Sequence, residues 1–146
     1  MSDEPVRVAF VCVRNAGRSQ LATAFAERER AERGLTDRVE ILTGGTDPAD
    51  AVHGVVADAM DEVGLALEDR TPRAITADEL ATCDIVVTMG CSTLELDADA
   101  RVDVREWALS DPGGKDLEAV RSIRDAIRRH VGDLFDELEQ SVSRHA

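Results

Sequence analysis

The sequence predicts an α/β fold in which a parallel sheet is covered by helices on both faces. Short apolar runs rich in β-branched residues alternate along the chain with longer segments whose apolar residues recur every three or four positions. The first pattern is typical of buried strands and the second of amphipathic helices. Strands that alternate with helices favour a parallel sheet, because right-handed crossovers between parallel strands need helices between them. Neither repeats nor an interdomain linker are visible, so we expect one domain over residues 1–146.

Four apolar runs are predicted as strands, at residues 6–12, 39–42, 85–89 and 101–104. The second should end at Gly44 and Gly45, and the fourth has the weakest strand pattern. The first run ends at Cys12. Because ligands in sheets of this kind bind beyond the carboxyl ends of the strands, Cys12 stands where a ligand is expected.

Three segments are predicted as helices. One begins at Gln20 in a run of strong helix formers. Another spans residues 52–63 and stops at Gly64, a good C-terminal cap. The last covers residues 117–138, whose apolar positions mark a long amphipathic helix.

The chain carries many more acidic than basic residues. It has 30 Asp and Glu against 17 Lys and Arg, a net charge of −13, and Lys115 as its single lysine. A nucleic-acid binder needs a basic face, so no nucleic-acid partner is expected. This composition indicates adaptation to high salt (a halophilic protein), where screening removes the self-repulsion of like charges. An ordinary acidic surface is the alternative.

The sequence also indicates a cytoplasmic protein. No apolar run approaches the roughly 20 residues that cross a bilayer, and the start of the chain is acidic where a signal peptide would be basic. We therefore expect no membrane partner. Cys12, Cys83 and Cys91 are odd in number and lack metal-type pairing, which favours reduced thiols. Nor is a metal expected at the histidines, which fall in patterns typical of helix surfaces: His53, His130 and His145.

The motif that carries chemistry runs from Cys12 to Ser19 and reads Cys-Val-Arg-Asn-Ala-Gly-Arg-Ser. It lies between a predicted strand and a predicted helix. A loop in that place can aim successive backbone amides at a small anion, and the helix N-terminus adds positive potential. The oxyanion-binding positions predicted here are Val13, Arg14, Asn15, Ala16, Gly17 and Ser19.

Within this loop the residue types suit catalysis on an oxyanion. The positive field stabilises a thiolate at Cys12, the predicted nucleophile, and Arg18 can clamp two oxygens with its planar guanidinium. Gly17 lets the backbone approach the anion closely. Ser19 can donate a hydrogen bond to the sulfur, and Asn15 can brace the loop. The alternative is a buried cysteine at a strand end, beside an arginine without a chemical role.

The segment from Val11 to Ala22 resembles the phosphate loop of the low-molecular-weight protein tyrosine phosphatase superfamily, and in particular its arsenate reductase branch. Three further segments are similar to this family in the same order: Thr43-Gly-Gly-Thr-Asp-Pro48, Val87-Thr-Met-Gly-Cys91 and Trp107-Ala-Leu-Ser-Asp-Pro112. The resemblance spans nearly the whole chain. It implies a three-layer, doubly wound fold with a four-stranded parallel sheet, as in the low-molecular-weight phosphatases.

The resemblance also implies a general acid. Asp111, followed by Pro112, matches the position of the residue that protonates the departing oxygen in this family. A carboxylic acid suits that step. The alternative is a turn aspartate, because Asp-Pro-Gly-Gly is also good turn chemistry.

Two departures from the phosphatases favour a small inorganic oxyanion such as arsenate. Gly113 and Gly114 stand where the phosphatases tend to carry aromatic residues, and the chain has no tyrosine. Gln20 follows Arg18-Ser19 as in the reductases, whereas the phosphatases commonly have proline there.

Reduction of arsenate requires a second thiol, and the resemblance leaves its source open. Cys91 is the possible resolving thiol within the chain, but Ala98 stands where the thioredoxin-linked reductases place another cysteine. The chain is thus nearer to the mycothiol-linked reductases, in which an external small thiol attacks the adduct. Cys83 is expected to be a packed small hydrophobe.

The sequence therefore predicts an arsenate reductase, acting in arsenic resistance, that uses Cys12, Arg18 and Asp111. Its partners would be arsenate or a phosphate-like oxyanion and a thiol reductant, either a small thiol or a thioredoxin-like protein, with no tightly bound cofactor. The alternative is a low-molecular-weight protein tyrosine phosphatase that hydrolyses phosphate monoesters through a phosphocysteine intermediate. A third reading, a noncatalytic sensor of phosphate or arsenate, fits the intact set of catalytic residue types least well.

Overall fold

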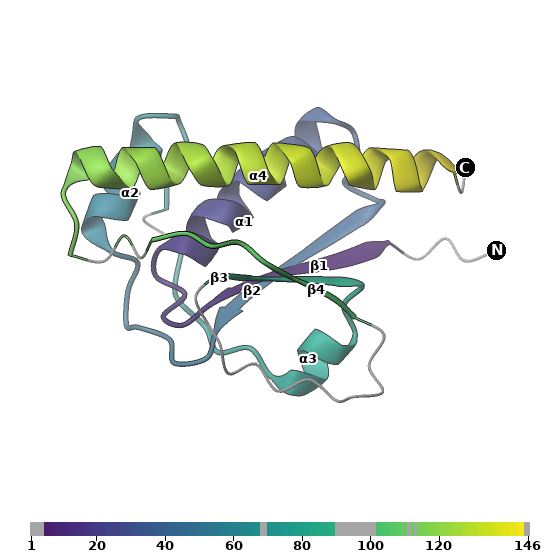
Figure 1. Cartoon of the computed structure of the whole chain (residues 1–146), viewed down its shortest axis with the longest axis horizontal. Coiled ribbons are helices and arrows are strands. Elements are labelled where there is room, and N and C mark those ends of the chain that lie inside the picture. Colours follow the sequence, from purple (N-terminus) through teal and green to yellow (C-terminus); the bar gives the residue numbers. More distant parts are fainter. Residues whose placement is uncertain (1–4, 68–69, 90–101, 111, 113, 145–146) are drawn as a thin grey trace.

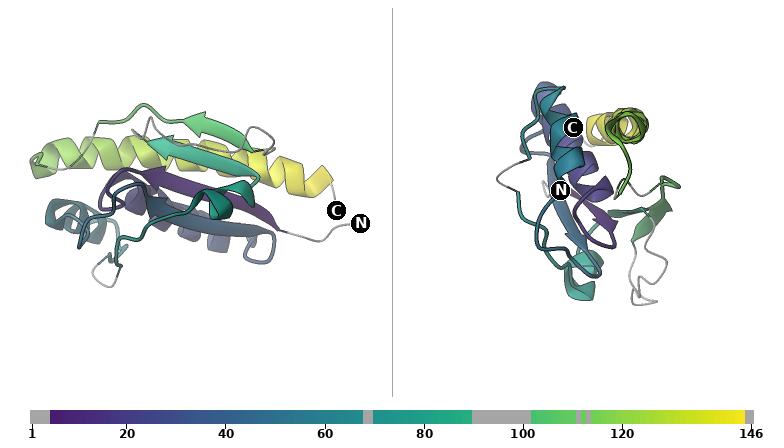
Figure 2. Two further views of the ribbon diagram at one scale, coloured as in Figure 1. Left: turned by 90° about the horizontal axis from the view of Figure 1, so that it is seen from below. Right: turned by 90° about the vertical axis from the view of Figure 1, so that its left-hand side faces the viewer.

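The computed structural model describes residues 5–67, 70–89, 102–110, 112 and 114–144. They contain one sheet of four parallel strands in the order β2-β1-β3-β4, with strands β1 (Val6–Cys12), β2 (Val39–Gly45), β3 (Ile85–Met89) and β4 (Asp103–Glu106). Helices cover both faces of this sheet (Figures 1 and 2). The predicted α/β fold with a parallel sheet between helical layers is confirmed.

The helices divide unevenly between the two faces. On one face lie α1 (Arg18–Glu32), α2 (Gly54–Asp61) and α4 (Leu117–Arg144), and on the other lies the short α3 (Ala77–Ala81) (Figure 1). None of the helices in the described part of the chain is long and apolar enough to span a membrane.

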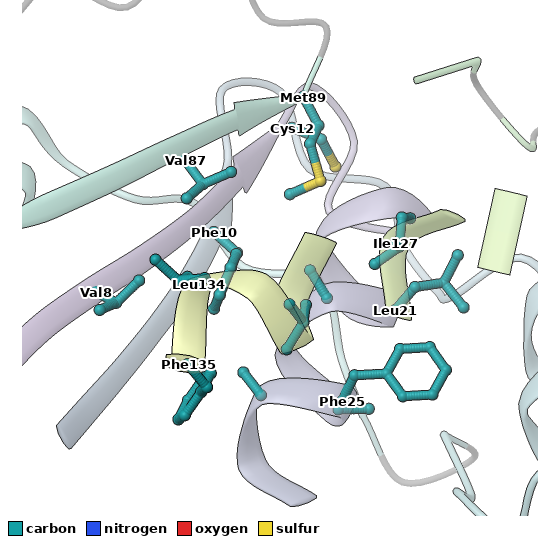
Figure 3. Packing of buried hydrophobic residues seen from close by; sticks show 14 of the residues in the cluster. Val8, Phe10, Cys12, Leu21, Phe25, Val87, Met89, Ile127, Leu134 and Phe135 are labelled. Atoms are coloured by element: carbon teal, nitrogen blue, oxygen red, sulfur yellow. The ribbon is translucent and has the colours of Figure 1, made fainter. Parts of the chain in front are cut away.

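The core follows from the alternation of side chains along β1. Phe10 and its neighbours two positions away point to the face covered by α1 and α4, where they pack with Phe25 and Phe135 (Figure 3). Ala9 and Val11 point to the other face and pack with Leu80 of α3. From Val8 to Cys12 β1 is buried on both faces, and this part of its sequence is a continuous apolar run.

Cys83 belongs to the smaller of these two core clusters. Its side chain is buried beside Leu80 and Val86, as predicted for a packed small hydrophobe. Burial raises the pKa of the thiol, because the thiolate would lose its hydration there. Cys83 is therefore held in its unreactive form.

The ends of the predicted strands differ from those observed. β2 continues through Gly44 and Gly45, since their backbones pair with Val11 and Cys12 despite the low strand propensity of glycine. β4 lies two residues later than predicted, because its register against β3 pairs Asp103 with Ile85. It is an edge strand with an exposed, charged sequence, so its hydrophobic pattern marks it poorly.

The helices also differ in part from the prediction. α1 begins two residues earlier, at Arg18, and α4 extends to Arg144. The short α3 was not predicted, although Thr76 and Glu79 form the reciprocal capping box that marks a helix start. Beyond α2, Gly64 adopts φ +78°, which agrees with its predicted role after the helix.

Arginine side chains tie α4 to the rest of the molecule. Arg33, which follows α1, contacts Asp136 and Glu139 of α4. From the other side, Arg121 and Arg124 of α4 both reach Glu62 at the end of α2. Arg105 of β4 adds a further ion pair with Glu137, so the long terminal helix is joined by ion pairs to β4 and to the residues that follow α1 and α2.

The Glu62 cluster makes stability depend on pH. The hydrogen bond from Arg121, aided by that from Arg124, lowers the pKa of Glu62 from 4.5 to about 2. A carboxylate with a lowered pKa stabilises the fold above its unfolded pKa and loses that contribution as the pH falls to its folded pKa. We expect Glu62→Gln to unfold at lower urea concentration than the wild type at neutral pH, and the difference to vanish near pH 2. A difference unchanged by pH would contradict the ion-pair account.

Candidate functional site

The candidate site lies where β1 ends and α1 begins. Cys12 is the last residue of β1, which is an inner strand of the sheet, and five residues separate it from Arg18, the first residue of α1. Figure 3 shows the Cys12 side chain next to Met89, at the carboxyl ends of β1 and β3. The position is the one predicted for a ligand from the parallel topology.

The Cys12 sulfur receives two polar contacts. Its distance to Ser19 Oγ is 2.9 Å, and the backbone N–H of Asn15 donates to it at 3.3 Å. Cys12 is 3% exposed, so these contacts lie in an environment that largely excludes water. Contacts that donate hydrogen bonds favour the thiolate over the neutral thiol.

The backbone carbonyls of the loop point away from its interior. Those of Cys12, Val13, Arg14 and Ala16 accept hydrogen bonds from backbone amides of Thr46, Asp47, Ala49 and His53, in that order. In a trans peptide the N–H points opposite to the C=O of the same unit. The N–H groups that follow these carbonyls are therefore turned inward, as the contact of Asn15 N with the sulfur shows. Together with the first amides of α1, which have no acceptor within the helix, they form a nest for an anion.

Gly45 of β2 lies directly against the backbone of this loop. A Cβ atom built on Gly45 would lie 2.5 Å from the carbonyl oxygen of Val13 and 3.0 Å from the backbone nitrogen of Asn15. The loop is thus packed directly on the backbone of β2. No side chain larger than hydrogen fits without moving the residues that carry the amides.

Asn15 is the hub of the loop. It adopts φ +51°, in the left-handed region that asparagine tolerates better than most residues. Its Nδ2 donates to Ser19 Oγ at 2.6 Å and to Thr43 Oγ1 at 2.9 Å, while its Oδ1 accepts from Arg73 N at 3.0 Å. The side chain is fully buried. Asn15 therefore connects the loop to α1, to β2 and to the segment at Arg73.

Arg18 links the loop to the segment that precedes α4. Its Nη1 donates to the carbonyl oxygen of Leu109 at 3.0 Å. Among the described residues no carboxylate pairs with Arg18, in contrast to Arg14, which pairs with Asp47 at 2.8 Å. The guanidinium of Arg18 has five N–H donors, and one of them donates to Leu109. The remaining donors can bind a ligand. It is a local positive charge in an otherwise acidic protein.

Pro112 makes a second link between the same two segments. A Cβ on Gly17 would lie 2.6 Å from Pro112 Cγ, so the proline ring rests against the loop backbone. Leu109 and Pro112 flank Asp111 in sequence and both contact the loop. Asp111 itself lies outside the described residues, as do Cys91, Ala98 and Gly113.

The histidines differ from the prediction of three helix-surface residues. His53 precedes α2 and lies beside the loop, where its N–H donates to Ala16. His130 does lie exposed on α4, with its ring stacked on Trp107 at 4.9 Å between centroids. His145 is outside the described residues. In the part of the chain that the structure covers, no three potential metal ligands come together.

Three contributors to the site were not assigned from the sequence. Thr43 was noted only as the first residue of a segment similar to the phosphatase family, and its contact with Asn15, 28 residues away, was not predicted. Arg73 contacts Asn15 across 58 residues of chain, a separation at which no local pattern points to it. Gln20 was noted for its position in the motif, but its contacts with Asn15 were not predicted. The arrangement as a whole provides a buried sulfur nucleophile, a cluster of amides for a tetrahedral oxyanion and a guanidinium at its edge.

Comparisons with known proteins agree with this chemistry. The family model described as low molecular weight phosphotyrosine protein phosphatase matches residues 7–144. A putative arsenate reductase of Halobacterium salinarum is 62% identical over 137 residues, covering 94% of this chain and 96% of that protein.

Solved structures share the fold. The thioredoxin-dependent arsenate reductase of Corynebacterium glutamicum has a TM-score of 0.77 and 28% identity; the match covers 97% of this chain but only 65% of that one. An arsenate reductase in a phosphate-binding state has a TM-score of 0.74 and 26% identity, covering 91% of this chain and 98% of that one. Since the family model spans nearly the whole sequence, the chain belongs to the low molecular weight phosphotyrosine protein phosphatase family.

Proposed function

We propose that the protein is an arsenate reductase that works as a single domain in the cytoplasm and contributes to arsenic resistance. One observation carries the chemistry: the Cys12 sulfur lies within 2.9 Å of Ser19 Oγ and 3.3 Å of Asn15 N, at the start of α1. A sulfur held by donors beside an amide nest is suited to attack a bound oxyanion. The name of the Halobacterium salinarum relative supports arsenate as that oxyanion.

The reaction proceeds in two steps in this proposal. The Cys12 thiolate attacks arsenic, a sulfur–arsenic bond forms, and one oxygen leaves as water after a general acid supplies a proton. A second thiol then attacks the Cys12 sulfur. A disulfide forms, the sulfur–arsenic bond breaks, and its electron pair stays on arsenic, which leaves as arsenite. Two thiols are oxidised for each arsenic reduced from the +5 to the +3 state.

Arg18 and Asp111 take the other two roles. Arg18 would hold two oxygens of arsenate through the donors not used by Leu109. Asp111 would be the general acid. The contacts of Leu109 and Pro112 with the loop support this assignment, because they fix the chain on both sides of Asp111 near the Cys12 motif.

The second thiol comes from outside the chain in this proposal. Its donor is a small thiol or a thioredoxin-like protein, and the thioredoxin dependence of the Corynebacterium glutamicum reductase supports an external donor in general terms. Cys83 is not a candidate, because it is buried on the other face of the sheet with a raised pKa. We further propose that the protein works at high salt, as its acidic composition indicates and as the Halobacterium origin of its relative supports.

Arsenate reduction and phosphate ester hydrolysis measured side by side test the proposed activity. Purified protein in molar potassium chloride should produce arsenite when arsenate and a thiol system are supplied, and should hydrolyse p-nitrophenyl phosphate more slowly. Hydrolysis without arsenate reduction would instead identify a phosphatase. Oxyanion binding without either reaction would identify a sensor.

The source of the second thiol has its own test. If an external thiol attacks the Cys12 adduct, Cys91→Ala should keep most of the arsenate reduction when that thiol and its reductase are present. If Cys91 attacks first, the variant should lose turnover, and wild-type protein quenched after arsenate should contain a Cys12–Cys91 disulfide. Mass spectrometry of the quenched protein separates the two routes.

A further inference from the structure

Gln20 forms hydrogen bonds with two atoms of Asn15. Its side chain is 2% exposed, and its Nε2 donates to the backbone oxygen of Asn15 at 3.0 Å and to Asn15 Oδ1 at 3.1 Å. A backbone carbonyl can only accept, so the contact with Asn15 O identifies the Gln20 atom as the amide nitrogen. Gln20 therefore fixes both the main chain and the side chain of Asn15.

The donors around Asn15 determine the orientation of its own amide. Gln20 Nε2 and Arg73 N both donate, so the Asn15 atom between them must be the carbonyl Oδ1. A flipped amide would place its NH₂ group against two donors. With Oδ1 held, Nδ2 must face Ser19 Oγ and Thr43 Oγ1.

This orientation sets the direction of the hydrogen bond at the sulfur. Ser19 Oγ accepts from Asn15 Nδ2 at 2.6 Å, and its single hydrogen is then available for Cys12 Sγ at 2.9 Å. Thr43 does not compete for the same role, because its hydroxyl donates to Phe10 O at 3.1 Å. The direction of each hydrogen bond is therefore fixed. Gln20 donates to Asn15, Asn15 donates to Ser19, and Ser19 donates to Cys12. A thiolate needs such a donor, since it can only accept.

We propose that Gln20 is a positioning residue that holds Asn15 so that the Ser19 hydroxyl donates to the Cys12 thiolate. The proposal rests on the role of Cys12 as the nucleophile in the proposed function. It does not depend on the substrate. The hydrogen bonds of the Gln20 side chain go to Asn15 and not to the sulfur, so Gln20 acts through Asn15.

The test is the alkylation of Cys12 by iodoacetamide, followed by mass spectrometry of the peptide that contains Cys12. Gln20→Met removes both donors and keeps the length of the side chain. We expect alkylation about tenfold slower than in the wild type at about pH 6, the size expected for losing one hydrogen bond to a charged group. At about pH 10 the rates should agree, because hydroxide at that pH can deprotonate a thiol whether or not a donor faces the sulfur.

A matched control is Thr23→Val. Thr23 is buried one turn later in α1 and donates to the backbone oxygen of Ser19 at 2.6 Å, without contacting Asn15. In Thr23→Val the alkylation rate at about pH 6, divided by the rate at about pH 10, should equal that of the wild type. Gln20→Glu, which presents an acceptor to Asn15, should lower that ratio as Gln20→Met does, and serves if the methionine variant does not fold.

The route of the effect is tested in a Ser19→Ala background. There Gln20→Met should change the alkylation rate at about pH 6 by less than twofold, because the hydroxyl that it directs is gone. A tenfold effect in that background would overturn the proposal. So would wild-type alkylation of Gln20→Met at about pH 6, or equal slowing at both pH values. Failure of the wild type to reduce arsenate would instead contradict the proposed function and leave this readout intact.

Discussion

Cys12→Ser should lower arsenate reduction by a factor on the order of 10³ or more. A hydroxyl is a far weaker nucleophile than a thiolate. Neither of the two described contacts at Cys12 can deprotonate it, because Ser19 Oγ and Asn15 N both act as donors in the proposed arrangement. The substitution is nearly isosteric, so the loop should keep its shape. Arsenite formation measured with excess thiol reductant provides the rate.

Two controls separate chemistry from folding in this variant. Cys83→Ala changes the buried thiol of the other core cluster and should retain arsenate reduction, although it lowers the melting temperature by opening a small cavity. Cys12→Ser should melt close to the wild type and still bind arsenate, because the amide nest and Arg18 remain. Turnover above about a tenth of the wild-type rate in Cys12→Ser would exclude Cys12 as the nucleophile.

Arg18→Lys should lower kcat/KM for arsenate by about 10²- to 10³-fold, the effect of removing one strong oxyanion donor from a preformed site. The planar guanidinium can hold two oxygens and the Leu109 carbonyl together, whereas an ammonium is a single point charge on a shorter reach. Arsenate binding in this variant is measured by the fluorescence of Trp107. That residue is the only tryptophan, and it stands two positions before Leu109.

The matched control for Arg18→Lys is Arg30→Lys in the same helix. Arg30 Nη1 donates to the Val39 carbonyl, far along α1 from the loop, so the substitution should leave kcat/KM within about twofold. In the wild type, arsenate should change Trp107 fluorescence as Arg18 redistributes its donors. An unchanged kcat/KM in Arg18→Lys would show that Arg18 does not bind the oxyanion.

Local patterns predicted the parts of the fold that short-range physics determines. The strands ending at Cys12 and Met89 were predicted with both boundaries correct, since both are short, mostly buried runs rich in β-branched residues. The exposed edge strand β4 was misplaced by two residues, because pairing with β3 sets its register and its own residues carry no comparable signal. The helix at Ala77 escaped prediction because five residues cannot show a helical period.

In the site, too, contacts between residues close in sequence were predictable and contacts between distant segments were not. The Cys12–Ser19 contact follows from the motif itself, because Cys12 ends the strand and Ser19 lies in the first turn of the helix on either side of one short loop. The contact of Arg18 with Leu109 joins residues 91 positions apart, and that of Arg73 with Asn15 joins residues 58 apart. These depend on how the loops pack after the sheet has formed. Composition and spacing contain no information about that packing.

The outward-turned carbonyls of the loop have a consequence for selectivity. Each of these carbonyls accepts a hydrogen bond from a backbone amide of a neighbouring segment, and the loop packs against Gly45. These contacts hold the amide nest in shape without a ligand. A preorganised amide nest loses little conformational entropy on binding, and it recognises the shape and charge of the anion alone. Arsenate and phosphate share both. Phosphate should therefore act as a competitive inhibitor, and the choice between the two ions should fall to the step after binding, when a thiol removes arsenic from sulfur with its electron pair.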